Sequence, residues 1–364
     1  MSSHTKVIID LSALRHNASI ARQAAPHSKL MAVIKADAYG HGMLAVAQAL
    51  SDVDGFAVAR LDEAIALRNA GITTPILVLT GFVSVDEVIQ FSSYDLDAVI
   101  HSEYQLELLN LSSLSTPISV WLKINTGMNR LGVDSSTVSR IHDALQLTGK
   151  VRLPIKLMTH LACADDMDSV STEKQIDLFD QSIVGLSGEQ SIANSAGLLG
   201  WQRAQRHWVR PGIMLYGGGP FCNVAANTDD LQAVMTLKSS VISLRTVKRG
   251  EFVGYGAVWQ AKRTSLIATI GIGYGDGYPR HAATGTPVIV AGQKAPLVGR
   301  VSMDSINVDV SQCVNIKVGD EVVLWGDGLP VEEVAEKSDT ISYELMCGIT
   351  DRVTRIIRES VDGE

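Results

Sequence analysis

Residues 30–42 read Leu-Met-Ala-Val-Ile-Lys-Ala-Asp-Ala-Tyr-Gly-His-Gly. The apolar run predicts a buried strand that ends at Lys35, and the glycine-bearing turn after it leads into a predicted helix that begins at Met43. A lysine in this place has two interpretations: it is a strand-end cation that reaches solvent, or partial burial lowers its pKa and makes the amine a nucleophile or base. Tyr39 supplies a phenol four positions later, and the two glycines let the backbone approach a ligand.

Strand-like and helix-like segments alternate from residue 29 to about residue 215. The candidate strands are 29–35, 55–59, 75–80, 97–101, 117–125, 155–161, 190–193 and 208–215, with amphipathic stretches such as 61–70, 102–111, 136–147 and 172–183 between them. About eight strand and helix pairs over roughly 200 residues predict a closed, eight-stranded α/β barrel of the TIM type. An open doubly wound sheet is the second interpretation, but no G-x-G-x-x-G opens a helix after a first strand.

The pattern changes after about residue 231. Short β-branched runs separated by glycine turns occupy 241–247, 265–272, 287–290, 306–310 and 318–325, and helical segments occupy 331–337 and 342–349. We therefore expect an α/β barrel domain over residues 1–230 and a mostly β domain over residues 231–364, joined by the Gly-, Asn- and Asp-rich stretch 217–230. The strand 5–10 is a candidate to pack with the second domain.

Composition excludes several classes of function. A formal charge of -8 over 364 residues gives no basic surface for nucleic acid. No apolar run has the length of a membrane span, and the N-terminal residues lack the pattern of a signal peptide, so we expect a cytoplasmic protein without a membrane partner. The four cysteines are widely spaced, which is typical of reduced thiols, and the nine histidines lack metal-ligand spacing, so no metal site is predicted.

Unusual polar residues follow the ends of the predicted barrel strands, where barrels carry their active sites. They are Lys35, Lys123, Asn125, His160, Asn194, Ser195 and Arg210. The small and hydroxyl residues of 194–197 and 212–213 suit phosphate binding by the loops after the last two strands, although Ser195 as a helix cap is an equally ordinary explanation.

The lysine segment resembles the pyridoxal-phosphate lysine segment of the alanine racemases, and the resemblance extends over almost the whole chain. The further matching segments are WLKINTGMNRLG (121–132), THLACADD (159–166), ANSAG (193–197), VRPGIMLYG (209–217), VGYG (253–256), GIGYGDGYPR (271–280), GRVSMD (299–304) and YEL (343–345). Several spaced segments in the right order make this a specific signal.

The resemblance implies that the 1–230 barrel binds pyridoxal 5'-phosphate. Lys35 would hold the cofactor through a Schiff base, and its phosphate would be bound by Tyr39, Ser195, Gly212, Ile213 and Tyr343. Arg210 would face the pyridine nitrogen, with His160 and Asn194 also at the cofactor. A permanent cation at that nitrogen disfavours its protonation, which limits leakage into transamination.

The same resemblance implies two-base racemisation of L-alanine and D-alanine by Lys35 and Tyr255 on opposite faces of the substrate. Free amines and phenols have ordinary pKa values near or above 10, so Schiff-base chemistry, burial and nearby cations must make both groups usable. A path from Tyr255 through His160 to Arg210 would supply such cationic influence. Without the resemblance, a tyrosine between two glycines would be read as a surface turn residue.

The resemblance further implies a homodimer with shared active sites. Tyr255, Met303 and Asp304 would reach the cofactor of the partner chain, while Arg130 would contact the cofactor's phenolic oxygen and the substrate carboxylate. Tyr274 and Tyr278 fall in the segment that resembles the family's substrate corridor.

Two points stay open at this stage. Lys123 is a candidate for carbamylation, but Asn125 stands where many relatives have Asp, so Lys123 beside a bound anion is the alternative. The competing functions are a barrel-type pyridoxal-phosphate amino-acid decarboxylase, a racemase of another small amino acid such as serine, and a non-catalytic cofactor carrier. The resemblance implies one of two roles for the enzyme: it supplies D-alanine for peptidoglycan, or it acts in alanine catabolism.

Overall fold

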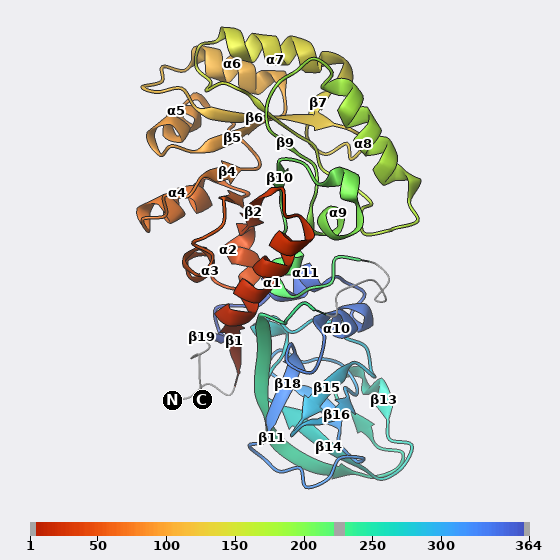
Figure 1. The fold of residues 1–364 in the computed structure, drawn as a ribbon. Helices are drawn as coiled ribbons and strands as arrows, with labels where there is room; N and C mark the ends of the chain where they lie inside the picture. The colour runs from red at the N-terminus through yellow and green to blue at the C-terminus, as the bar shows by residue number, and fades with distance from the viewer. Residues whose placement is uncertain (1–4, 222–229, 360–364) are drawn as a thin grey trace.

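The computed structural model describes residues 5–221 and 230–359. Its two parts are an α/β barrel and a mostly β domain, which occupy the upper and lower halves of Figure 1. The expected linker 217–230 falls partly outside the described residues, because residues 222–229 are not included.

Eight parallel strands form the barrel, and the pairing of β5 with β6 closes it. The strands are β2 (Lys29–Val33), β3 (Gly55–Val58), β4 (Ile76–Val78), β5 (Asp97–Ile100), β6 (Ser119–Asn125), β8 (Lys156–Met158), β9 (Gln190–Ser191) and β10 (Trp208–Val209), and the short β7 (Val133–Asp134) pairs parallel with the end of β6. The predicted closed barrel is confirmed and the open sheet is excluded, although every strand is shorter than the sequence pattern indicated.

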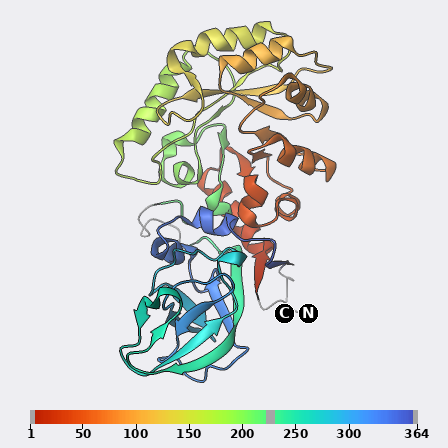
Figure 2. The same cartoon turned by 180° about the vertical axis from the view of Figure 1, so that it is seen from behind.

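Helices surround the barrel strands on the outside (Figures 1 and 2). They are α1 (Leu11–Ala24), α3 (Met43–Ala49), α4 (Leu61–Asn69), α5 (Val85–Ser93), α6 (Glu103–Leu111), α7 (Val138–Leu147), α8 (Val170–Ser182) and α9 (Ser195–Gly200), together with the 3₁₀ turns η1 (Ser135–Thr137), η2 (Gln202–Ala204) and η3 (Ile213–Tyr216). Asp10 caps α1 by accepting from the N–H groups of Ser12 and Ala13, and Ser84 caps α5 in the same way through Glu87. Within the described residues, no helix is long and apolar enough to cross a membrane.

The second domain is built on an eight-stranded sheet with the long β11 (Met235–Val247) at its centre. The other strands of the domain are β1 (Lys6–Asp10), β12 (Phe252–Val253), β13 (Trp259–Gln260), β14 (Ser265–Ile270), β15 (Pro287–Val290), β16 (Gln293–Pro296), β17 (Ile306–Asp309), β18 (Glu321–Trp325) and β19 (Thr354–Arg358). Helices α10 (Val331–Lys337) and α11 (Ser342–Cys347), and turns η4 (Tyr255–Ala257) and η5 (Tyr274–Asp276), complete it.

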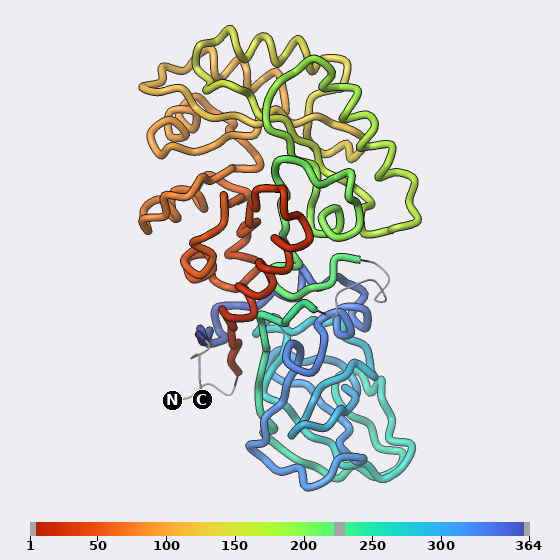
Figure 3. Tube along the Cα trace, viewed as in Figure 1, coloured from red at the N-terminus to blue at the C-terminus, as the bar shows by residue number. Residues whose placement is uncertain are grey.

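The first strand of the chain belongs to this second sheet. β1 pairs antiparallel with β11 and parallel with β19, so the two ends of the described chain run side by side, as Figure 3 shows. α11 of the second domain packs on the segment Lys35–Gly40 of the barrel. These contacts fix the second domain against the barrel next to Lys35.

Candidate active site

The predicted site residues gather at the carboxyl ends of the barrel strands. Lys35 lies two residues after β2, Lys123 lies within β6, His160 lies two residues after β8, and Arg210 directly follows β10. Since parallel strands end at the same rim of a barrel, the strand order brings these four groups to one side.

The segment Lys35–Gly40, labelled α2, is a left-handed turn. Four consecutive residues, Ala36 to Tyr39, have φ between 52° and 55°. Left-handed backbone costs a residue with a side chain roughly 1–2 kcal/mol. Such a turn persists only where surrounding contacts determine it, and it therefore marks the lysine segment as a functional one.

The contacts that determine the turn come from three directions. Glu63 of α4 accepts the Ala36 N–H at 2.7 Å, and the Asp37 carboxylate accepts the Met43 N–H at 2.7 Å. On the third side a Cβ atom on Gly40 would lie 2.3 Å from the carbonyl oxygen of Met346, so only glycine lets α11 pack this closely. The turn is thus held by the barrel and by the second domain together.

Four cations share the rim: Lys35, Lys123, Arg130 and Arg210. None of them forms an ion pair within the described part of the chain. Burial, and then repulsion from Arg130, lowers the pKa of Lys35, which Glu63 partly offsets. Lys123 is only 8% exposed, and its burial together with the three neighbouring cations lowers its pKa to about 7. So much uncompensated positive charge fits a ligand that carries several negative charges.

Arg210 is held by acceptors rather than by a carboxylate. Its guanidinium donates to the carbonyl oxygens of Thr159 at 2.7 Å and Ile192 at 3.2 Å and to the hydroxyl of Ser191, and Nη2 lies 3.4 Å from Nδ1 of His160. Burial lowers the pKa of Arg210 to about 10, which leaves it charged at neutral pH. Burial and then Arg210 hold the pKa of His160 well below its usual value, so the His160 ring is neutral.

A small cradle lies between the first, seventh and eighth loops of the barrel. The Ser195 hydroxyl oxygen accepts the N–H groups of Gly212 at 2.9 Å and Met214 at 3.4 Å. A Cβ on Gly212 would lie 2.5 Å from the Tyr39 hydroxyl, so that hydroxyl rests directly against the glycine. Tyr343 of α11 adds a second phenol, because its ring lies 5.8 Å from that of Tyr39.

The donor set of the cradle fits the phosphate of pyridoxal phosphate. It combines the hydroxyls of Ser195, Tyr39 and Tyr343 with the backbone at Ile213, and neutral hydroxyl and amide donors of this kind bind phosphate oxygens. The Gly212 N–H orients the Ser195 hydroxyl by donating to its oxygen, so that the hydroxyl proton is left for a ligand. Burial, and then the Asp165 carboxylate, raises the pKa of Tyr343 to about 12, and burial raises that of Tyr39 further. Both phenols therefore keep the proton that a phosphate oxygen would accept.

Two further predicted residues have local structural contacts. Asn194 caps α9, because its side chain accepts the Gly197 N–H at 2.8 Å. The Asn125 side-chain oxygen accepts the N–H groups of Gly127 and Asn129 at 3.1 and 3.0 Å, and this orders the loop before the exposed Arg130.

One chain does not bring Tyr255 to Lys35. Tyr255 lies in η4, between β12 and β13, and these strands are far from α2 in both Figures 1 and 2. Tyr255 is 70% exposed and Met303 is 52% exposed, which is unusual for such apolar side chains. Asp304 is exposed as well, and Arg352 donates to it at 2.7 Å. Of the two corridor tyrosines, Tyr278 is 1% exposed and stacks on Trp325, whereas Tyr274 is 40% exposed and is the one accessible to a ligand.

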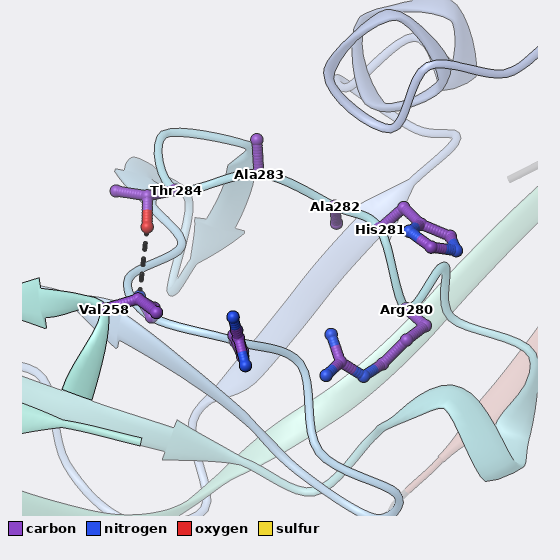
Figure 4. Close-up of a pocket in the computed structure, with 8 residues that line it drawn as sticks. Val258, Arg280, His281, Ala282, Ala283 and Thr284 are labelled. Atoms are coloured by element: carbon purple, nitrogen blue, oxygen red, sulfur yellow. Dashed lines mark hydrogen bonds between the residues drawn. The ribbon is translucent and has the colours of Figure 1, made fainter. Parts of the chain in front are cut away.

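A basic cavity of about 620 Å³ opens beside this exposed surface and is shown in Figure 4. Arg280 and His281 lie on the segment that leads past two alanines to Thr284, and the Arg280 guanidinium extends toward the Val258 side. The Gly299 N–H closes this loop by donating to the Thr284 hydroxyl at 3.2 Å. Arg300 also lines the cavity and comes close to η4, since a Cβ on Gly256 would lie 3.0 Å from its guanidinium.

The sequence pattern missed residues that support the predicted ones. Gln175 of α8 accepts the Ala162 N–H at 2.9 Å and donates to the His160 carbonyl oxygen at 3.1 Å and to the Thr126 hydroxyl at 3.2 Å. Glu63 and Ser191 have comparable roles beside Lys35 and Arg210. Their sequence signal is weak, because each is a polar residue on an ordinary helix or strand.

Comparisons with known proteins agree with this geometry. Residues 9–220 match the family model for the alanine racemase N-terminal domain, and residues 234–357 match the model for the alanine racemase C-terminal domain. The alanine racemase of Vibrio vulnificus (strain CMCP6) is 48% identical over 345 residues, which are 95% of this chain and 96% of that protein. The alanine racemase of Shewanella piezotolerans is 46% identical over 353 residues, 97% of this chain and 99% of that one.

Solved structures give the same result. The biosynthetic alanine racemase of Pseudomonas aeruginosa superposes with a TM-score of 0.95 at 43% identity and covers 98% of this chain and 100% of its own. The alanine racemase of Acinetobacter baumannii superposes with a TM-score of 0.92 at 36% identity, with coverage of 98% and 100%.

Proposed function

Since the chain belongs to the alanine racemase family, whose members interconvert L-alanine and D-alanine with pyridoxal phosphate, we propose that Lys35 and Tyr255 are its two acid–base groups. The chain is accordingly an isomerase, and the relatives support racemisation over the decarboxylase and carrier alternatives. The absence of a carboxylate beside Arg210 in the described structure also favours a racemase, because barrel-type decarboxylases pair the pyridine nitrogen with a carboxylate.

Pyridoxal phosphate, when bound, supplies an electron-withdrawing π-system that acidifies the α-proton of an attached amino acid. Lys35 would hold its carbonyl carbon, and Arg210, supported by His160, would face its pyridine nitrogen. The residues proposed at its phosphate are Tyr39, Ser195, Gly212, Ile213 and Tyr343, with Asn194 holding the loop that carries Ser195.

Racemisation needs one group on each face of the substrate's α-carbon. In one direction the Lys35 amine removes the α-proton and the Tyr255 phenol returns a proton to the opposite face, and in the other direction the roles exchange. The lowered pKa of Lys35 favours the neutral amine, which can accept a proton. Arg130 would hold the substrate carboxylate, and a carbamate or bound anion at Lys123 would balance the charge of the rim.

The second base has to come from another molecule, so we propose a homodimer with shared sites. Tyr255 and Met303 are exposed on the second domain, as is Asp304, so all three side chains are accessible to a second molecule. A two-fold dimer would bring these residues to the rim of the partner barrel, and because the same contact occurs twice, each of the two sites would be completed once.

We propose that the chain supplies D-alanine for peptidoglycan in the cytoplasm, with alanine catabolism as the alternative role. The P. aeruginosa relative is named a biosynthetic enzyme, and the described cysteines Cys163, Cys313 and Cys347 are unpaired, as is usual in a reducing compartment. Deletion of the gene should make growth depend on added D-alanine if the role is biosynthetic.

The observation that carries the function is the meeting of Lys35, the Arg210–His160 pair and the Ser195–Gly212 cradle at one rim. Incubation of the pure protein with L-alanine and with D-alanine tests it directly. We expect each isomer to yield the other without release of carbon dioxide. Carbon dioxide release, or bound cofactor without turnover, would contradict the proposal.

A further inference from the structure

His41 is a fully buried histidine at the end of the left-handed turn. Its Nδ1 lies 2.9 Å from the carbonyl oxygens of both Ala38 and Tyr39. Carbonyl oxygens only accept, so Nδ1 carries the proton and Nε2 is left as a buried acceptor. Nε2 has no hydrogen-bond partner within the described residues.

The two carbonyl groups that His41 satisfies belong to the turn itself. Backbone hydrogen bonds also hold the turn: the Gly42 N–H donates to the Asp37 carbonyl oxygen and the Ala38 N–H to the Ile34 carbonyl oxygen, both at 3.0 Å, and the His41 N–H donates to the Ala38 carbonyl oxygen at 3.2 Å. The Tyr39 carbonyl oxygen has the His41 ring as its donor. A buried carbonyl without a donor is unfavourable, so the imidazole favours the left-handed conformation over its alternatives.

The His41 ring also continues into an aromatic stack that ends at the cradle. Its centroid lies 4.5 Å from that of Tyr216, and the Tyr216 ring lies 4.7 Å from that of Tyr39. The Tyr216 hydroxyl donates to the Val33 carbonyl oxygen at 2.9 Å, so the middle ring is fixed to the end of β2. The stack connects the buried imidazole to the phenol that rests against Gly212.

We propose that His41 is a positioning residue for the cofactor: its Nδ1–H and its stack on Tyr216 hold the left-handed turn that sets the spacing between the Lys35 amine and the Tyr39 hydroxyl. This inference rests on the proposed cofactor roles of Lys35 and Tyr39. Phenylalanine would fill the same volume and keep the stack, but it would leave the Ala38 and Tyr39 carbonyls without the ring donor. The donor is therefore the feature that a variant has to remove.

Matched amide variants isolate this donor. His41→Asn places an amide nitrogen at the position of Nδ1, and His41→Gln places it one bond farther out, near the position of Nε2. His41→Leu removes both nitrogens. His142→Leu is the control, because His142 is also buried in the barrel, on α7, and neither of its ring nitrogens has a hydrogen-bond partner in the described structure.

The readouts are the rate of cofactor loss from the holoenzyme during dialysis, followed by its absorbance, and deuterium exchange of the amides of residues 36–43. We expect His41→Gln and His41→Leu to release cofactor about tenfold faster than wild type, which is the effect of one lost buried hydrogen bond. We expect the amides of residues 36–43 to exchange faster in these two variants. The cofactor release rate of His41→Asn should stay within about threefold of wild type. His142→Leu should change thermal stability without changing the rate of cofactor release.

Two results would overturn the role of His41. Equal release rates for the Asn and Gln variants would show that the Nδ1 donor is irrelevant, and an unchanged exchange pattern in His41→Leu would show that the turn does not depend on the ring. Retained turnover in Lys35→Ala would contradict the proposed function instead, so the two failures are distinguishable.

Discussion

The guanidinium of Arg210 approaches Nδ1 of His160 to 3.4 Å while donating to three other acceptors in the barrel interior. Burial, and then this cation, lower the pKa of His160 and keep the imidazole neutral, and no hydrogen bond within the described residues occupies its other nitrogen. The pair therefore combines a fixed positive charge with a neutral ring, which suits a group that faces the pyridine nitrogen.

Arg210→Lys should lower kcat/KM by about 10- to 100-fold, because an ammonium cannot reproduce the planar fork that reaches several acceptors at once. The measurement is the steady-state rate of alanine racemisation in both directions, together with the melting temperature. Arg203→Lys is the control, since Arg203 pairs with acidic residues on the surface of the barrel. Equal activity of Arg210→Lys and wild type would contradict the role given to Arg210.

Lys123→Met should raise stability at low pH more than at high pH. The pKa of Lys123 is about 7 in the folded chain and near 10.5 when unfolded, so the unfolded chain binds more protons between these values and stability rises with pH there. The destabilisation of the folded chain by the charged Lys123 is therefore complete below pH 7 and disappears as the pH rises toward 10.5. We expect the variant to melt about 2–4 °C higher than wild type at pH 6 and with a smaller difference at pH 9, in buffer free of carbon dioxide and added anions.

A constant difference across this pH range would contradict the burial of a charged Lys123. The same experiment repeated with bicarbonate separates the two interpretations of this residue. If Lys123 forms a carbamate, the wild-type chain should lose its destabilisation at low pH only when bicarbonate is present.

Gly212→Ala should weaken cofactor binding by about tenfold or more, because the added Cβ would lie 2.5 Å from the Tyr39 hydroxyl and push it from the cradle. Its φ of -123° lies outside the left-handed region that favours glycine. Gly200→Ala is the matched control: its Cβ would lie equally close to Sδ of Met167, but that partly exposed side chain can move. Fluorescence titration of each apoenzyme with pyridoxal phosphate gives the dissociation constants, and equal values for the two variants would contradict the cradle.

Much of the barrel was predictable because its strands are buried runs separated by polar turns. The strand predicted at 208–215 illustrates the limit of this pattern. The strand ends at Val209, since Pro211 has no N–H to donate and Ile213–Tyr216 turns into η3. Apolar residues continue after the strand because η3 is equally buried, so the apolar run alone could not show where the strand ends.

The left-handed turn could not be predicted from its own residues. Alanine, aspartate and tyrosine have no strong local preference for positive φ, and the conformation depends on Glu63 from α4 and on Met346 from α11, more than 300 positions from Lys35. The same holds for Tyr216 and Gln175, whose importance follows from the partners that the fold brings to them. Lys35, the proposed catalytic lysine, was recognisable because a cation after a buried strand is unusual.

Lys35→Ala and Tyr255→Phe should separate cofactor binding from proton transfer. Lys35→Ala should lose both the absorbance band of the bound cofactor and turnover, whereas Tyr255→Phe should keep the band and lose racemisation chiefly in one direction of proton transfer. Absorbance spectra and deuterium incorporation at the α-carbon of each alanine isomer provide the measurements. Wild-type racemisation by Tyr255→Phe would exclude the two-base assignment.

The most direct test of the shared site combines these two inactive variants in one dimer. In a mixed dimer, one site lacks both groups and the other has the Lys35 of one chain and the Tyr255 of its partner intact. Refolding equal amounts of the two variants together should restore about one quarter of wild-type activity, because half of the dimers are mixed and each has one complete site. Activity no higher than that of the separate variants, in dimers shown to be mixed, would contradict a site built from both chains.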